Sequence, residues 1–224
     1  MTDKSSTDIN KIVSDEIVEK SIDLSIEYSE IALDEFLKDG ILKEIPIVKS
    51  IVSFYNISSS IIDRHKTKKI LTFFKEFHSK HIDEKKLEVF KNKFNSDDAY
   101  RRKVVETIVL LNERFYHIEK TKILANLFIS YIEEEITWQE FVDISFVLDN
   151  FHPRGFTYLK ALFEVEFKDR HKDAHEGEGL MFACGIGYRF GNRFTINSLG
   201  KKFYNFGLKK TDLKIYPQDI GSKF

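Results

Sequence analysis

Two histidines and an arginine lie close together at residues 170–175, where their chemistry would suit a metal ion or a phosphate. His171 and His175 are four residues apart, the spacing that places two imidazoles on one face of a helix. Carboxylates surround the pair at Asp169, Asp173, Glu176 and Glu178. The spacing permits a metal clip, but the sequence shows no third ligand of evident geometry. We therefore expect no metal and no other cofactor.

Arg170 and His175 also match a ribonuclease pattern. The segment RHKDAH, residues 170–175, resembles the arginine, polar residue, spacer, histidine signature of the HEPN ribonucleases, which are all-helical RNA-cutting domains. The resemblance implies that Arg170 stabilises a developing phosphorane and that His175 moves a proton. In this chain the motif precedes a glycine-rich hairpin instead of lying in a terminal helix. Ribonuclease activity is therefore an alternative, and a non-enzymatic protein is the main expectation.

Four cations near the end of the chain suggest a second alternative, contact with nucleic acid. Arg189 and Arg193 flank Gly191-Asn192, a link that favours a tight hairpin because glycine adopts positive φ without steric cost. Lys201 and Lys202 follow closely. The helix expected before the hairpin is rich in carboxylates, which would oppose binding to phosphates. We therefore do not expect nucleic acid as the partner.

The elements that must position these residues are mostly helices. Apolar residues recur at three- and four-residue steps over residues 9–37, which predicts an amphipathic helix or a broken pair. Pro46 suits a first helical turn. The same periodicity predicts later helices at 67–80, 83–95, after 96, at 119–133, from 137 to 152 and at 156–170.

Polar residues mark where several of these helices begin and end. Ser96 and Asn197 are the expected N-caps of their helices. Thr137-Trp-Gln-Glu140 is a capping box, and His152-Pro153 ends the helix that it opens. Between the helix at 156–170 and the hairpin we expect a polar loop, HKDAHEGEG.

The fold class that follows is mainly α. We expect a helical bundle with a small C-terminal winged-helix-like α+β module that contains a two-stranded hairpin, because helix, helix, hairpin, helix is the order of a winged helix. The expected domains are an N-terminal helical region at 1–115 and a second helical region at 116–224 that ends in the winged-helix-like module.

The most apolar segment, residues 41–63, has two interpretations. Its uncharged stretch falls short of the roughly 20 residues that a membrane-spanning helix needs. It could lie flat on a membrane beside the basic run RHKTKK at 64–69, or it could be a core helix. The residues expected to contact a membrane or partner are Ile47, Val48, Ile51, Val52, Phe54 and Tyr55.

Composition and charge give the broad setting. The single cysteine, Cys184, and an N-terminus without a basic, apolar leader predict a cytoplasmic protein, with membrane association left open. The formal net charge is -1, yet charge alternates along the chain, with -7 over 1–63, +7 over 64–103, -6 over 104–153 and +5 over 154–224. Such blocks suggest segments that attract one another, within one chain or between copies, although solvated helix faces would give the same pattern.

Three stretches carry a resemblance that spans most of the chain: residues 31–77, 120–145 and 193–203, the last reading RFTINSLGKKF. They resemble an uncharacterised family of bacterial helical proteins, and the order of elements resembles the abortive-infection alpha proteins. The resemblance implies a bacterial or phage-related setting and a part in antiviral defence, with no catalytic residues to carry over. We therefore expect a non-enzymatic interaction protein that acts through self-association, a partner protein or a membrane surface.

Overall fold

The structure is a computed structural model that describes residues 9–18, 46–55, 61–164, 174–191 and 193–213. The side chains of residues 46–48 and 174–176 lie outside this description. The chain divides into two compact units, unit 1 at residues 1–121 and unit 2 at residues 122–224. Helices dominate both, and the part of the chain described contains one small antiparallel sheet. The expected fold class, mainly α with a small C-terminal two-stranded hairpin, is confirmed.

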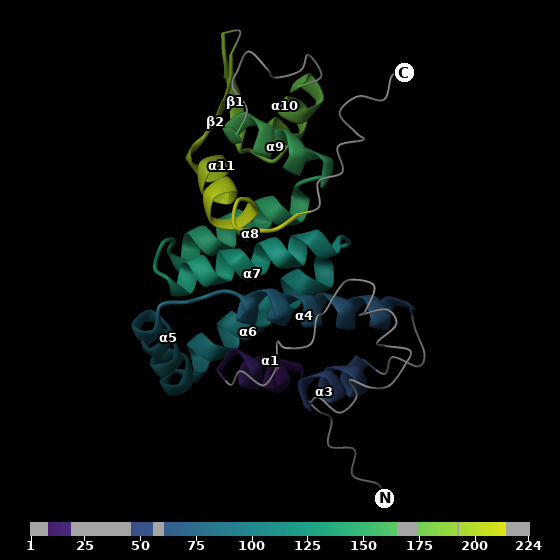
Figure 1. Cartoon of the computed structure of the whole chain (residues 1–224), viewed down its shortest axis with the longest axis vertical. Coiled ribbons are helices and arrows are strands. Elements are labelled where there is room, and N and C mark those ends of the chain that lie inside the picture. The colour runs from purple at the N-terminus through teal and green to yellow at the C-terminus, as the bar shows by residue number, and fades with distance from the viewer. Residues whose placement is uncertain (1–8, 19–45, 56–60, 165–173, 192, 214–224) are drawn as a thin grey trace, which may run out of the picture. The chain divides into compact units, whose positions relative to one another are not determined.

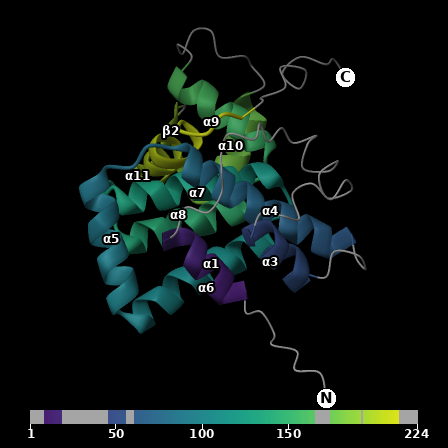
Figure 2. The same ribbon diagram turned by 60° about the horizontal axis from the view of Figure 1, so that its bottom comes forward.

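Unit 1 is built from helices that bury one face each. Its elements are α1 (Ile9–Val18), α3 (Pro46–Tyr55), α4 (Ile61–Ser79), α5 (Glu84–Ser96) and α6 (Asp98–Arg114). Helices α1 and α3 pack against each other, α6 contacts α1, α4 and α5, and α3 lies beside α4 (Figures 1 and 2). The buried faces supply the core of the unit, which includes Val13, Ile51, Phe73, Phe74, Phe94, Val104 and Ile108. Aliphatic and aromatic burial of this kind is the main stabilising contribution to a helical unit.

The expected N-cap of α6 is wrong by one residue. Asp97 caps the helix, because its carboxylate accepts a hydrogen bond from the Tyr100 amide at 2.9 Å. Ser96 is instead the last residue of α5. Both residue types cap well, so the sequence alone does not separate two adjacent candidates.

Unit 2 combines helices with the hairpin. Helix α7 (Ile118–Ile132) enters it and is followed by α8 (Trp138–Asn150), α9 (Arg154–Glu164), α10 (Ala174–Ala183), β1 (Gly187–Phe190), β2 (Arg193–Ile196) and α11 (Ser198–Lys202). A π-helical turn, η3 (Phe203–Leu208), continues α11. Aromatic rings form much of the core, since Phe151, Phe156 and Phe203 contact one another with centroids 5.5 to 6.4 Å apart. The hairpin projects beyond α9 and α11 (Figure 1).

Two local predictions in unit 2 are confirmed. Thr137 and Glu140 form the capping box of α8, with the Thr137 hydroxyl accepting from the Glu140 amide and the Glu140 carboxylate accepting from the Thr137 amide. Asn197 caps α11 by accepting from the Gly200 amide. These caps satisfy amide groups that a helix leaves without partners at its first turn.

The polar loop expected at residues 171–179 is wrong over residues 174–179, which belong to α10. Glycines disfavour helices, which is why the segment reads as a loop. Here Gly177 allows α10 to pack directly on α9, because a Cβ at this position would lie 2.2 Å from Cγ of Tyr158. Tertiary packing has therefore overridden local propensity.

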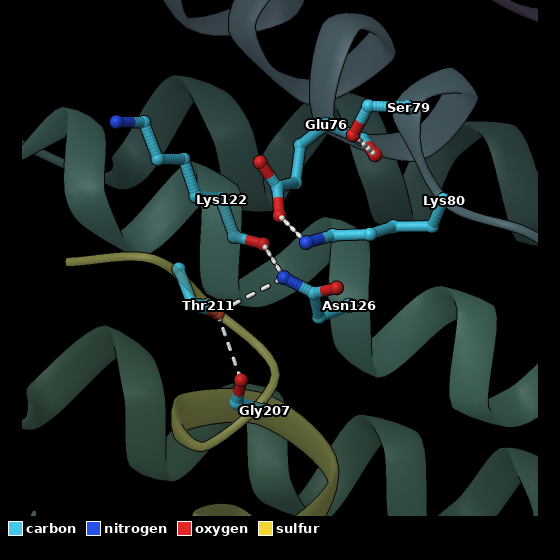
Figure 3. Close-up of polar contacts among 7 residues, drawn as sticks. All are labelled: Glu76, Ser79, Lys80, Lys122, Asn126, Gly207 and Thr211. Atoms are coloured by element: carbon cyan, nitrogen blue, oxygen red, sulfur yellow. Dashed lines mark hydrogen bonds and ion pairs between the residues drawn. The ribbon is translucent and has the colours of Figure 1, made fainter.

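A buried polar contact fixes the end of the described chain to α7. The Asn126 side-chain amide donates to the Lys122 carbonyl at 3.2 Å and to the Thr211 hydroxyl at 3.0 Å (Figure 3). The Thr211 hydroxyl donates in turn to the Gly207 carbonyl at 2.8 Å. Gly207 also packs closely on α7, since a Cβ there would lie 2.9 Å from Ile123. Satisfied buried polar groups of this kind specify one arrangement of the elements.

The close approach of α11 to the base of the hairpin gives a stability prediction. A Cβ at Gly200 would lie 2.5 Å from the backbone oxygen of Ile186, which cannot move aside as a side chain could. We expect Gly200→Ala to lower the free energy of unfolding by about 1 to 3 kcal/mol. Chemical denaturation monitored by circular dichroism measures the change.

Gly179 is the matched control, because it lies in α10 and a Cβ added there would meet no neighbour within 4 Å. We expect Gly179→Ala to raise the free energy of unfolding by about 0.5 to 1 kcal/mol through helix propensity. Equal effects of the two substitutions would contradict the packing assigned to Gly200.

Candidate functional site

The register of the hairpin separates its residues into two faces. Residues opposite each other share a face, and β1 pairs with β2 as Tyr188 with Thr195 and Phe190 with Arg193. We call these four residues the hairpin outer face. The other face carries Ile196, which is buried, and Phe194, whose ring covers Gly187. Within the described part of the chain the hairpin is therefore anchored on one side through Ile196, and on the other side Tyr188, Phe190 and Arg193 are exposed.

Aromatic rings dominate the hairpin outer face. Phe190 is 81% exposed and Tyr188 is 47% exposed. They are two residues apart on one strand, so their rings project in the same direction. Arg193 is exposed and lies across the strands from Phe190. Exposed aromatics beside an arginine are the composition of protein interaction sites.

The four cations proposed for nucleic-acid contact are not equally available. Arg189 donates to the Glu178 carboxylate on α10 at 2.5 and 3.1 Å. Lys202 pairs with Glu140, and this contact lowers the pKa of the Glu140 carboxyl. Arg193 and Lys201 are exposed. Two of the four positive charges are thus held by carboxylates, which weakens the attraction of this region for phosphates.

The helix before the hairpin differs from the one expected. The chain reaches β1 through α10, and α9 ends at Glu164 within the described residues. The sequence of α10, AHEGEGLMFA, contains two glutamates and no lysine or arginine. Sequence reasoning missed Glu178 as a partner of Arg189, because it did not predict a helix at residues 174–183.

The residues of the ribonuclease and metal hypotheses lie mostly outside the described residues. Arg170, His171 and Asp173 fall in the undescribed range 165–173, and only the backbone of His175, in α10, is described. Across the described part of the chain, no three His, Cys, Asp or Glu side chains gather as a metal ion would require. Both hypotheses stay predictions.

The apolar segment at 41–63 divides between core and surface. Ile51 and Tyr55 are buried in α3, Val52 is half-buried and Phe54 is exposed. The side chains of Ile47 and Val48 lie outside the description. No helix within the described ranges is both long and apolar enough to traverse a bilayer. The exposed apolar side chains of this region lie instead around the start of α4.

A second surface surrounds that start. Ile61 is 84% exposed and Ile62 is 67% exposed, and Tyr116 after α6 is also largely exposed. With the neighbouring cations these residues form what we call the apolar-basic end: Phe54, Ile61, Ile62, Arg64, Lys68 and Tyr116. In the sequence, this surface was indicated by the junction of an apolar segment with the basic run RHKTKK. Which side chains of α3 are buried could not be read from the sequence.

A polar frame holds the apolar-basic end together. Tyr55 donates to the Glu113 carboxylate at 3.0 Å, and Lys66 lies 3.5 Å from the same carboxylate. Burial, and then the negative charge of Glu113, raises the pKa of Tyr55. His65 Nε2 lies 2.8 Å from the Tyr116 carbonyl oxygen. These contacts join the ends of α3 and α6 to the start of α4.

Lys69 lies at the centre of this frame, only 2% exposed. Its ammonium group donates to the backbone carbonyls of Glu113 at 3.0 Å and Phe115 at 2.6 Å, which are carbonyls that the end of α6 leaves without helical partners. Burial lowers the pKa of Lys69 to about 8. The arrangement is a buried helix cap, in which the ammonium group serves the structure of the helix end.

A groove in unit 1 is a further concave feature of the described part of the chain. It has a volume of about 630 Å³ and is lined by Asn10, Lys11, Ser14, Asp15, Val18, Asn95, Asp98, Arg101, Arg102, Val105 and Glu106. Charged residues of both signs line it, and Arg101 is paired with Asp98. Small-molecule sites are mostly apolar with a few convergent polar groups, so this groove does not define a ligand.

Comparisons of the chain with protein-family models, with curated proteins and with solved structures found no match.

The buried Lys69 gives a prediction about pH. Its pKa is about 8 in the folded protein against 10.5 ordinarily, so between these values the unfolded chain binds more protons. The free energy of unfolding must therefore rise with pH in this window. From pH 8 to 9.5 we expect a rise of about 1 to 2 kcal/mol that Lys69→Met lacks. Urea denaturation of both proteins at several pH values measures the difference, and parallel curves would refute it.

Proposed function

We propose that this protein is a non-enzymatic interaction protein of bacterial anti-phage defence that self-associates through the hairpin outer face. The observation that carries the proposal is the exposure of Phe190 and Tyr188 on one face of a hairpin whose other face is anchored. The whole-chain resemblance to abortive-infection alpha proteins supplies the expectation of defence. The structural observation supports the binding mode only.

Burial of these two rings would provide the driving force. Large aromatic side chains contribute most of the binding free energy at protein interfaces, because they remove much apolar area from water at a low entropic cost. The base of the hairpin is held before binding, since Gly200 of α11 packs closely on Ile186 and Ile196. A fixed surface loses little conformational freedom when a partner binds.

A second copy of the chain fits this face for a chemical reason. In a two-fold interface the same patch meets itself, so each copy must offer complementary groups. The hairpin outer face has both kinds, two aromatic rings and the exposed Arg193 guanidinium. An arginine of one copy can stack on an aromatic ring of the other. The alternating charge blocks of the sequence offer a different, purely electrostatic mode of association.

The test is the molar mass in solution, measured by size-exclusion chromatography with light scattering over a range of concentrations. The chain has a mass of 26.4 kDa, and we expect wild-type protein to reach a multiple of it. The double variant Tyr188→Ser, Phe190→Ser should weaken association at least about tenfold, because roughly 1.4 kcal/mol of lost burial suffices for that factor. A wild-type protein that stays monomeric would overturn the proposal.

The matched control is Phe146→Ser on α8, which removes an aromatic residue that is 55% exposed. It should leave the mass unchanged. Salt separates the two modes, because the Debye length falls from about 10 Å at 0.1 M to about 3 Å at 1 M. Association through the hairpin persists at high salt. Association that vanishes there, and that ignores the hairpin variant, would assign it to the charge blocks instead.

A further inference from the structure

The second strand of the hairpin has an open edge. Within the described part of the chain the sheet has two strands, so β2 has a hydrogen-bonded neighbour on one side, β1. The Asn197 amide donates to the Ile186 carbonyl at 3.0 Å, and this bond sets the alternation of the ladder. Thr195 therefore directs its backbone groups toward β1, whereas Phe194 and Ile196 direct theirs away from it.

The backbone groups on this edge have no hydrogen-bond partner among the described residues. No hydrogen bond there joins the amide or the carbonyl of Phe194 or Ile196 to a group outside the ladder. Helix α10 contacts the other strand, β1 (Figure 1). Gly200 of α11 approaches the side chain of Ile196 and the backbone oxygen of Ile186, which are not the groups of this edge. A row of unpaired backbone groups is a template for another strand.

The residues of β2 suit strand pairing. Phenylalanine, threonine and isoleucine are all enriched in strands, and they occupy positions 194–196. Natural proteins often block an exposed edge with proline, lysine or a bulge, and residues 194–196 contain none of these. The strand is 4 residues long, so a contact through its edge is modest in strength.

A second copy of β2 satisfies the outward groups in one antiparallel register. With Thr195 opposite Thr195 of the second copy, Phe194 of each copy lies opposite Ile196 of the other. Each of these pairs exchanges both of its hydrogen bonds. A register centred on Phe194 or on Ile196 instead leaves the groups of the other residue without a partner in β2.

The side chains that this register brings together are compatible on both faces of the sheet. On one face Phe194 meets Ile196 of the other copy, which is a favourable pair of an aromatic and a β-branched residue. On the other face Thr195 meets Thr195, and Arg193 meets Asn197. No two like charges lie opposite each other, so the strand is complementary to itself.

We propose that two copies of the chain pair edge to edge through β2, in an antiparallel register centred on Thr195. The two hairpins then form a four-stranded sheet with β1 of each copy at its outer edges. The bonding groups are backbone groups of β2, so this contact does not rest on the proposed function, which uses the rings of Tyr188 and Phe190 on β1. A chain that makes both contacts assembles beyond a pair.

The experiment is disulfide trapping of the full chain with Thr195→Cys in a Cys184→Ser background. Opposite residues in a pair without mutual hydrogen bonds have Cα atoms about 4.5 Å apart, within the roughly 4.4 to 6.8 Å that a disulfide spans. Under mild oxidation we expect most of the protein to become a covalent pair on a non-reducing gel.

The matched control is Arg193→Cys in the same background, on the same strand and face. In this register the two copies of residue 193 lie about 13 Å apart, because four residues of strand separate them. We expect it to cross-link at least about tenfold more slowly. Absence of the Thr195→Cys cross-link, or equal rates for the two cysteine variants, overturns the proposal.

Repeating both variants with Tyr188→Ser, Phe190→Ser separates this contact from the hairpin outer face. Thr195→Cys should still cross-link faster than Arg193→Cys there, because neither ring contributes to the edge. Loss of that difference assigns the contact to the outer face and overturns the edge pairing. If wild-type protein forms no larger assembly while the difference persists, the proposed function fails and the edge pairing stands.

A second pair of variants tests the backbone bonds themselves. Phe194→Pro removes an amide hydrogen that points away from β1, a position that an edge strand tolerates. Phe194→Val removes the same ring and keeps the amide. We expect Phe194→Pro to slow the Thr195→Cys cross-link by about tenfold relative to Phe194→Val, because each copy loses one hydrogen bond. Circular dichroism establishes that both are folded, and equal rates contradict the edge pairing.

Discussion

The arrangement of unit 1 depends on one buried contact, the cap that Lys69 places on the end of α6. A helix that ends inside a protein leaves carbonyl groups without partners, and each would be costly to bury unsatisfied. The Lys69 ammonium group satisfies those of Glu113 and Phe115, at the cost of burying its own charge. That cost is visible in its lowered pKa. The contact fixes α4 against α6, and so it determines where Ile61 and Arg64 face.

The hairpin of unit 2 is also held in place by buried contacts, but these are packing contacts instead of a charged cap. Its anchored face is held at the base, where Ile196 is buried and Gly200 of α11 approaches the backbone of Ile186 too closely for a side chain to fit. A two-stranded hairpin alone is marginally stable in water, so this support is what keeps it formed. Among the described residues the buried anchor, Ile196, lies on one side, and the rings of Tyr188 and Phe190 lie exposed on the other. In both units a rigid support carries exposed apolar side chains.

Sequence reasoning predicted most of the helices because their apolar periodicity is strong and their caps are local. The capping box at Thr137 and the two-stranded hairpin were predicted from neighbouring residues alone, and the box and the pairing of β1 with β2 are present in the structure. Helix α10 was not predicted, because its two glycines disfavour a helix locally and the packing of Gly177 on Tyr158 is not visible in the sequence. The cap of α6 by Lys69 joins residues more than 40 positions apart, so no local sequence pattern predicts it.

The candidate surfaces were predictable only in outline. The sequence drew attention to the apolar segment before RHKTKK and to the cations of the hairpin. It could not show that Ile51 and Tyr55 are buried while Ile61 is exposed, because α3 and the start of α4 are similarly apolar. Nor could it show that Glu178 pairs with Arg189 of the hairpin and Glu140 with Lys202 of α11, since these ion pairs form across the fold. Exposure and pairing are tertiary properties.

Hydroxyl-radical footprinting of side chains tests most directly the central claim, that the exposed rings of the supported hairpin are the binding groups. Concentrating the protein should protect Tyr188 and Phe190. Phe146 and Val89 should react equally at all concentrations, because they are exposed outside the hairpin. Unchanged reactivity at Phe190, or uniform protection that includes Val89 and Phe146, would contradict the claim.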